Sequence, residues 1–423
     1  MNVREISELR PDERAAIFDR DAGVEDVRED VREIVDRVSE EGDVAIREYS
    51  EEFDDVSVGN LDVTDAAERA VDEIDDDVRE AIETAAENVR AFHERQVPAD
   101  WREDFEGRDL GRRFTAVERA GVYVPGGTAA YPSSALMGVI PAKVAGVDHV
   151  AVATPPAEEL NPVTLAAIGI AGADAVYQVG GAQGIAALAY GTETVDRVQT
   201  VVGPGNRWVT AAKAEVRGDV EIDFLAGPSE VAVLADGTAD PDLVAADLVA
   251  QAEHDTHASV VAVTDDPALA EAVAEAIEGQ VPGRQREETI RGALDNDASG
   301  VFLARSMSEA VLFVEEYAAE HLAIVADEDE ALLDRIDSAG SVFLGPHSPV
   351  AAGDYASGPN HVLPTGGGAR RYGGLSVDTF LRSTTVQRLD ETALGDLSET
   401  ITTLAEAEGL EAHAESVRKR FEE

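Results

Sequence analysis

Two neighbouring residues, Glu320 and His321, directly precede an apolar run that is predicted to be a strand. A carboxylate and an imidazole at the edge of a strand can act as acid and base, because imidazole titrates near neutral pH. A second group lies in the segment 353–365, GDYASGPNHVLPT, which places Asp354 and His361 around a Ser-Gly-Pro turn. Long ordered loops rich in Gly and Pro commonly carry function, so we predict a site there.

A metal site is a second possibility, because Gln251 and His254 lie three residues apart near the end of a predicted helix. That spacing puts both side chains on one face, where they can bind one ion, although a solvated helix end would show the same spacing. Asp354 and His413 would complete a set of four nitrogen and oxygen ligands. Such a set suits zinc or manganese, and the sequence, which contains no cysteine, does not choose between them.

Between about 117 and 235, short apolar runs alternate with Ala-rich helical runs. This alternation predicts βαβ units and a largely parallel sheet. The predicted strands lie at 121–124, 149–153, 175–179, 198–202 and 231–235, and the predicted helices at 134–145, 162–171, 185–190 and 208–216.

The first four of these strands end in turns, PGG at 125–127, TPP at 154–156, GGAQ at 180–183 and GPGN at 203–206. Ligands of open α/β sheets bind at the carboxyl ends of strands, where glycine lets main-chain N–H groups approach a phosphate. A GxGxxG dinucleotide motif is missing, so each turn alone is weak evidence. Four such turns in register favour a cofactor site.

A second α/β segment is predicted from about 236 to 375. Asp240 and Pro241 begin a helix that runs to about His254, because they supply an N-cap and a proline at the first helical position. Residues 1–100 and the tail from about 376 are predicted to be helical. Further strands are predicted at 259–264, 300–304, 322–326 and 341–345.

The formal net charge is −52, and the chain has only three lysines, Lys143, Lys213 and Lys419. One interpretation of this charge is that the protein binds a basic partner, but the acidic residues are scattered rather than gathered in a tail. The other interpretation is that the surface is adapted to high salt. Near 1 M salt the Debye length is about 3 Å, so the repulsion between the acidic side chains is screened. We therefore expect a halophilic source.

The composition also argues against several partners and compartments. No basic stripe is present, so nucleic-acid binding is not expected. The N-terminal stretch lacks the apolar run of a signal peptide, and no segment reaches the roughly 18–20 apolar residues of a membrane span. We expect no membrane association and predict the cytoplasm as the compartment.

Blocks along nearly the whole chain, in collinear order, resemble the histidinol dehydrogenase family. The blocks include IDFLAGPSEVAVLAD, DLVAQAEHD, AEHL, GDYASGPNHVLPT and AEAEGLEAH, and they lie at 122–127, 179–183, 203–206, 222–236, 247–255, 319–322, 339–345, 353–365 and 405–413.

For the fold, the resemblance implies an α/β chain with two incomplete Rossmann-like parallel-sheet domains and small helical N- and C-terminal domains. The expected division is a small N-terminal segment at 1–20, a first Rossmann-like domain with the metal and catalytic residues at 21–120 plus 236–375, a second that binds NAD at 121–235, and a helical C-terminal domain at 376–423 that contributes to the partner subunit's site.

For the site, the resemblance implies that Glu320 and His321 are the catalytic pair. It implies one zinc ion per subunit, with His413 supplied by the neighbouring subunit of a domain-swapped homodimer. The zinc ligands would be Gln251, His254, Asp354 and His413. The substrate-binding residues would be Ser229, Gln251, His254, His321, Asp354, His361, Glu408 and His413, and the NAD-binding residues Tyr123, Gln183 and Asn206.

The activity implied by the resemblance is the last steps of histidine biosynthesis. In these steps NAD oxidises L-histidinol by four electrons, through L-histidinaldehyde, to L-histidine. His321 would accept protons in both steps. Because the chain has no cysteine, water would have to be the nucleophile that adds to the aldehyde, and Glu320 would activate it. The alternatives are a zinc-dependent dehydrogenase of another small amino alcohol, a zinc hydrolase, and a non-enzymatic two-lobed binding protein.

Two positions depart from the family pattern. Ala318 and Ala319 stand where the family commonly has Gly-Pro, a change that removes no functional side chain. His257 is an additional histidine without a role in the family, and we expect it at the surface or behind the site residues.

Overall fold

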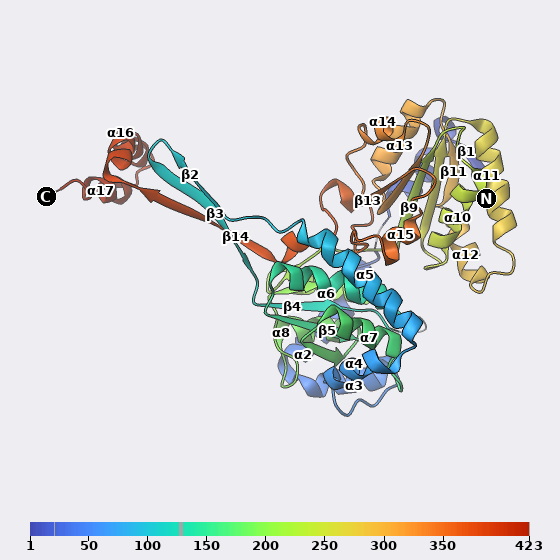
Figure 1. Ribbon diagram of the computed structural model, residues 1–423, viewed down its shortest axis with the longest axis horizontal. Coiled ribbons are helices and arrows are strands. Elements are labelled where there is room, and N and C mark those ends of the chain that lie inside the picture. The colour runs from blue at the N-terminus through green and yellow to red at the C-terminus, as the bar shows by residue number, and fades with distance from the viewer. Residues whose placement is uncertain (21, 127–129, 423) are drawn as a thin grey trace. The chain divides into compact units, whose positions relative to one another are not determined.

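The computed structural model describes residues 1–20, 22–126 and 130–422 (Figure 1). It divides into two compact units. Unit 1 comprises Met1–Gln96 and Val117–Phe380, and unit 2 comprises Val97–Ala116 and Leu381–Glu423.

A five-stranded parallel sheet in unit 1 has the strand order β6-β5-β4-β7-β8. Its strands are nearly continuous apolar runs because helices cover both faces of a parallel sheet. The strands are β4 (Arg119–Tyr123), β5 (His149–Thr154), β6 (Ala175–Gln178), β7 (Thr200–Val202) and β8 (Glu221–Ile222), and the connecting helices are α6 (Pro132–Ala145), α7 (Pro162–Ala171), α8 (Gly181–Tyr190) and α9 (Arg207–Val216).

The acidic N-terminal helices pack mainly on the helices that cover this five-stranded sheet. They are α2 (Arg28–Glu41), α3 (Asp43–Phe53), α4 (Thr64–Glu73) and α5 (Asp76–Glu94), of which α2 packs against α8, α4 against α7 and α5 against α6. The predicted division instead grouped residues 21–120 with 236–375. The structure differs because an amphipathic helix buries its apolar stripe on any complementary face, and the sequence pattern does not specify which one.

A six-stranded parallel sheet forms the other core of unit 1, with the order β1-β11-β10-β9-β12-β13. Its central strand β9 (Glu230–Ala235) was predicted as part of the NAD-binding segment, and its edge strand β1 (Val3–Glu5) as part of a separate N-terminal segment, so both differ from the predicted division. The other strands are β10 (Ser259–Thr264), β11 (Gly300–Leu303), β12 (His321–Val325) and β13 (Ser341–Leu344).

The helices next to the six-stranded sheet follow the order expected of βαβ units. They are α10 (Pro241–Ala252), α11 (Pro267–Gln280), α12 (Glu287–Leu294), α13 (Met307–Tyr317), α14 (Asp329–Leu333) and α15 (Val350–Tyr355), preceded near the N-terminus by α1 (Pro11–Phe18). The four short 3₁₀ helices among the described residues are Ile6–Glu8, Glu25–Val27, Gly368–Arg370 and Val377–Phe380. No described helix is long and apolar enough to cross a membrane.

Unit 2 is an antiparallel sheet of β2 (Trp101–Phe105), β3 (Arg108–Ala116) and β14 (Leu381–Leu389), followed by α16 (Glu391–Ala407) and α17 (Glu411–Arg418). The strand β14 differs from the helix predicted at its position. Its sequence, LRSTTVQRL, contains the β-branched residues that favour strands but lacks an apolar alternation that would reveal the strand.

Candidate active site

Glu320 and His321 lie at the start of β12 and are buried, with 7% and 4% of their surfaces exposed. The main chain of Glu230 contacts both side chains. Its N–H donates to Oε2 of Glu320 at 2.8 Å, and its carbonyl oxygen lies 3.2 Å from Nδ1 of His321. Because a carbonyl oxygen only accepts hydrogen bonds, Nδ1 of His321 carries a proton, and Nε2 is the ring atom that can act as a base.

The Nε2 atom of His321 faces Asp354 of α15. It lies 3.4 Å from Oδ1 of Asp354, is buried, and forms no hydrogen bond with any described residue. Burial alone lowers the pKa of His321, but the carboxylates of Glu320 and Asp354 outweigh it and raise this pKa to about 10. Burial alone raises the pKa of Asp354, and the charges of His321, His361 and His254 hold it below its ordinary value.

The predicted metal ligands of unit 1 lie at the junction of α10 and α15, which pack against each other. Gln251 is buried in the last turn of α10, and His254 follows that helix. Nδ1 of His254 lies 3.3 Å from the carbonyl oxygens of Ala250 and Gln251. Main-chain carbonyls that hold one ring nitrogen leave the other, Nε2, available for a cation.

This donor set fits a divalent cation in part. The described residues contain no group of three or more His, Cys, Asp or Glu side chains arranged to hold a metal. Of the predicted ligands in unit 1, only His254 and Asp354 are among these four residue types. Gln251 would coordinate the metal through its amide oxygen. His413 lies exposed on α17 of unit 2 and is described with that unit alone.

The remaining predicted substrate residues are divided between the two units. Ser229, half-buried, precedes β9 and accepts a hydrogen bond from the N–H of Ser259. His361 is held by its Nδ1, which lies 2.7 Å from the carbonyl oxygen of Asp354, and burial lowers its pKa. Glu408 is exposed at the C-terminal end of α16 in unit 2.

Glu320 and His321 lie at the amino-end edge of the six-stranded sheet, as expected from their position just before an apolar run. His321 is the first residue of β12 and Glu230 the first of β9, and in the register His321 is opposite Val231. These are amino ends of parallel strands, whereas the prediction from strand-end turns concerned carboxyl ends. The prediction of a cofactor site from the strand-end turns concerned the five-stranded sheet alone, and it stays a prediction.

The three predicted NAD residues lie at the carboxyl ends of the five-stranded sheet. Tyr123 ends β4, is buried, and its hydroxyl accepts a hydrogen bond from the N–H of Gly181 at 3.0 Å. Gln183 is buried in the first turn of α8. Asn206 is the N-cap of α9 and accepts from two main-chain N–H groups. Gly127 of the predicted PGG turn lies outside the described residues.

An ion pair that sequence inspection missed fixes the GPGN turn. Lys213 and Asp223 pair with side chains only 3% and 1% exposed. Nζ of Lys213 donates to the carbonyl oxygen of Gly203 at 3.0 Å, and the N–H of Gly203 donates to Asp223 at 2.9 Å. Gly203 has a φ of +114°, and a Cβ there would lie 2.2 Å from the carbonyl oxygen of Tyr123. The scarcity of lysine was the available signal.

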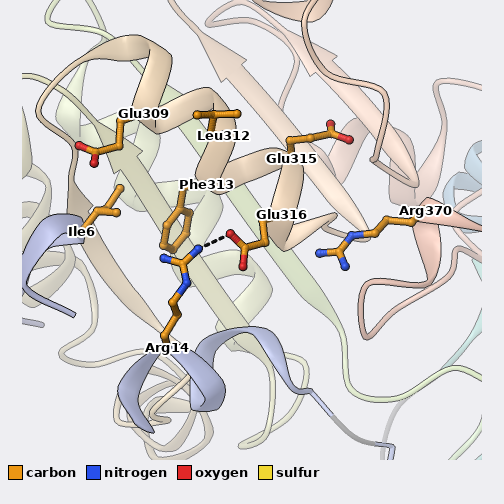
Figure 2. Close-up of a pocket in the computed structure, with 8 residues that line it drawn as sticks. All are labelled: Ile6, Arg14, Glu309, Leu312, Phe313, Glu315, Glu316 and Arg370. Atoms are coloured by element: carbon orange, nitrogen blue, oxygen red, sulfur yellow. Dashed lines mark hydrogen bonds and ion pairs between the residues drawn. The ribbon is translucent and has the colours of Figure 1, made fainter. Parts of the chain in front are cut away.

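A surface pocket of about 570 Å³ contains none of the predicted site residues. Figure 2 shows Arg14 paired with Glu316 at its centre. The pocket is lined by Ile6, Arg14, Glu309, Leu312, Phe313, Glu315, Glu316 and Arg370. Since the buried Glu320 and His321 are not among these residues, we place the chemistry elsewhere.

Comparison with known proteins decides the family. A model of the histidinol dehydrogenase family matches residues 19–421. The histidinol dehydrogenase of Haloarcula marismortui is 79% identical over 422 residues and that of Halobacterium salinarum 72% over 424 residues, each alignment covering 100% of both chains. The chain belongs to the histidinol dehydrogenase family. The crystal structure of histidinol dehydrogenase from Elizabethkingia anophelis is 36% identical, with a TM-score of 0.94 over 100% of this chain and 98% of that one.

Membership of the histidinol dehydrogenase family confirms the resemblance predicted from the motifs, and the structural match confirms the α/β fold. It makes the chain an NAD-dependent oxidoreductase. The high identity to two haloarchaeal histidinol dehydrogenases agrees with the halophilic source expected from composition.

Ala318, which stands where the family commonly has glycine, adopts a backbone conformation that favours glycine. Ala318 ends α13 with a φ of +51°, in the left-handed region. Glycine adopts this conformation without the roughly 1–2 kcal/mol cost of a Cβ atom, which accounts for the family's preference there. The turn nevertheless forms with alanine, and it is followed by Glu320 and by His321, the first residue of β12.

Proposed function

We propose that this protein oxidises L-histidinol to L-histidine with two molecules of NAD⁺. The observation that carries the proposal is the buried Glu320–His321 pair, held by the main chain of Glu230 and facing Asp354, in a chain 79% identical to a histidinol dehydrogenase over its whole length. An acid–base pair beside ionisable groups suits a reaction that moves a proton in each of two steps.

In the first step, Nε2 of His321 accepts the hydroxyl proton of the alcohol, while NAD⁺, held by Tyr123, Gln183 and Asn206, would take a hydride from the carbon that bears this hydroxyl. This gives the aldehyde and NADH. Water, activated by the Glu320 carboxylate, then adds to the aldehyde. After His321 has released its first proton to solvent, a second NAD⁺ would take a hydride from the hydrate carbon while His321 accepts a hydroxyl proton. This gives the carboxylic acid, which loses a further proton to solvent and becomes the carboxylate. The chain has no cysteine that could replace water as nucleophile.

We propose a homodimer in which Gln251, His254, Asp354 and the partner's His413 bind one zinc per subunit. The support is the donor set at the junction of α10 and α15 and the exposure of Glu408 and His413 on unit 2. Zinc would hold the substrate's imidazole and amine, and its charge would offset that of Asp354, which favours the unprotonated form of His321. Ser229 and His361 would bind substrate, and Tyr123, Gln183 and Asn206 would bind NAD. We also propose a cytoplasmic location.

The test is an assay of the purified protein in molar KCl with zinc, NAD⁺ and L-histidinol. We expect two NADH for each L-histidine released, measured by NADH absorbance and by mass spectrometry. Other small amino alcohols serve as control substrates. Formation of one NADH with accumulation of the aldehyde, or preference for another amino alcohol, would contradict the proposal.

A further inference from the structure

The side chain of Glu230, whose main chain contacts Glu320 and His321, forms a buried ion pair with Arg20. The side chains of Arg20 and Glu230 are 8% and 3% exposed. Nε of Arg20 donates to Oε1 of Glu230 at 2.7 Å, and Nη2 of Arg20 donates to Oε2 at 3.2 Å. Two parallel bonds of this kind fix a carboxylate in direction as well as in position.

The Arg20 guanidinium is itself fixed by the protein around it. Its Nη1 donates to the carbonyl oxygen of Ile17 at 3.0 Å, and its Nη2 to that of Tyr317 at 2.7 Å. It also lies 3.6 Å from the centre of the Tyr317 ring, and the hydroxyl of Tyr317 is 2.7 Å from Oγ of Ser259. The pair therefore rests on a rigid, buried support rather than on solvent.

Glu230 connects this support to the reacting groups. Its main-chain N–H donates to Glu320, and its carbonyl oxygen accepts from His321. Its Oε1 also accepts the N–H of Gly366 at 2.7 Å, which holds the segment that follows His361. Glu230 thus fixes both Glu320 and His321 and also the segment that follows His361.

We infer that Arg20 and Glu230 are positioning residues, which hold the main chain at the start of β9 so that Glu320 and His321 keep their orientation; the inference rests on the proposed function. Without Arg20, the Glu230 carboxylate would be buried without its cation, and it would move or recruit water. A shift of about 1 Å at a reacting group can cost about 10²-fold in rate.

The experiment compares Arg20→Ala with Arg4→Ala in the full-length, zinc-loaded protein. Arg4 lies on β1 of the same sheet, where it donates to Ser299 and covers the Phe302 ring, and it contacts no site residue. We expect Arg20→Ala to lower kcat of both oxidation steps by about 10- to 100-fold, with zinc content and the KM for NAD⁺ near wild type. Arg4→Ala should leave kcat unchanged.

Two further readouts separate positioning from general stability. Millimolar guanidinium should restore kcat of Arg20→Ala, whereas methylammonium should not, because only the planar fork makes two parallel bonds. In nitrogen-15 spectra of histidine-labelled protein, with His321 assigned by its loss in His321→Asn, the wild type should show a protonated Nδ1. Arg20→Ala should show a shifted Nδ1 resonance, because the hydrogen bond from Nδ1 to the Glu230 carbonyl would lengthen.

A folded Arg20→Ala protein with wild-type kcat would overturn the inference. If that variant does not fold, Glu230→Gln replaces it, with an expected loss in kcat of about 10-fold; wild-type kcat in that variant would have the same meaning. If the wild type itself does not reduce NAD⁺ with L-histidinol, the proposed function fails, and the inference fails with it.

Discussion

Nε2 of His321 lies 3.4 Å from Oδ1 of Asp354, and both groups are largely buried. The contact joins the first residue of β12 to the short helix α15. Because Nδ1 of His321 is occupied by the Glu230 carbonyl, Nε2 is the atom left for a substrate proton. The proposed roles of His321, Glu320 and the zinc ligands lead to a separate prediction for each.

His321→Asn should lower kcat of alcohol oxidation and of aldehyde oxidation alike, by about 10²–10⁴-fold, because the base serves both steps. Zinc content should stay near wild type, since His321 is not among the proposed ligands. Steady-state assays with histidinol and with added histidinaldehyde measure the two steps. His257→Asn, which changes an exposed histidine, is the control. Unchanged turnover in His321→Asn would eliminate His321 as the base.

Glu320→Gln should mainly slow the oxidation of added histidinaldehyde, because only that step requires an activated water. The amide oxygen can still accept the hydrogen bond from the N–H of Glu230, so the local structure should survive. We expect a loss of about 10²-fold in the aldehyde step. The measurement compares single-turnover rates from the alcohol and from the aldehyde. A loss confined to alcohol oxidation would contradict the assignment.

His413→Asn and Asp354→Asn should each lower zinc occupancy, because each removes one proposed ligand. If the site is shared between subunits, a mixture of the two variants should regain activity, since some dimers then contain one intact ligand set. Zinc analysis and activity after mixing test this. Mixtures that stay inactive, in dimers shown by mass spectrometry to have exchanged subunits, would argue against a shared site.

The sequence predicted the parallel strands well, since β4, β5, β10 and β12 each contain a short run of consecutive apolar residues between helical segments. It did not predict which sheet each element joins. The strand β9 was predicted in the same domain as the five-stranded sheet, at 121–235, yet it lies in the centre of the six-stranded sheet. Local periodicity reports that a face is apolar, and the choice of partner depends on the whole fold.

Prediction of the site was limited in a similar way. His321 and Asp354 were found as chemical types, and the structure brings them together with His361. Arg20 and Glu230 could not be found by pattern, because a buried ion pair between residues 210 positions apart has no local signature. Lys213 could have been suspected, since it is one of only three lysines.

Lys213→Met should lower the free energy of unfolding by about 3–5 kcal/mol, because Asp223 would remain buried without its cation. It should also raise the KM for NAD⁺, because Lys213 holds the carbonyl of Gly203 in the GPGN turn. The matched control is Lys143→Met, which removes a more exposed partner of Asp174 and should cost about 0–1 kcal/mol. Urea unfolding in molar KCl measures both. Equal losses in the two variants would contradict the prediction.

Asp54→Asn should stabilise the protein at alkaline pH. Burial raises the pKa of Asp54 to about 6, and its Oδ2 is buried without a hydrogen-bond partner among the described residues. The folded state therefore binds the proton more tightly than the unfolded state. This contribution to stability is complete below the pKa of the unfolded state, which lies near the ordinary Asp value of 3.8, and is lost as the pH rises through about 6. Because the residue is half-buried, we expect a gain of about 1 kcal/mol in the free energy of unfolding for Asp54→Asn at about pH 8 and almost none at about pH 4.

Urea unfolding at both pH values measures the difference, with Asp55→Asn as the control for the loss of one negative charge. A gain of the same size at both pH values would show that the charge on Asp54 is not its cause.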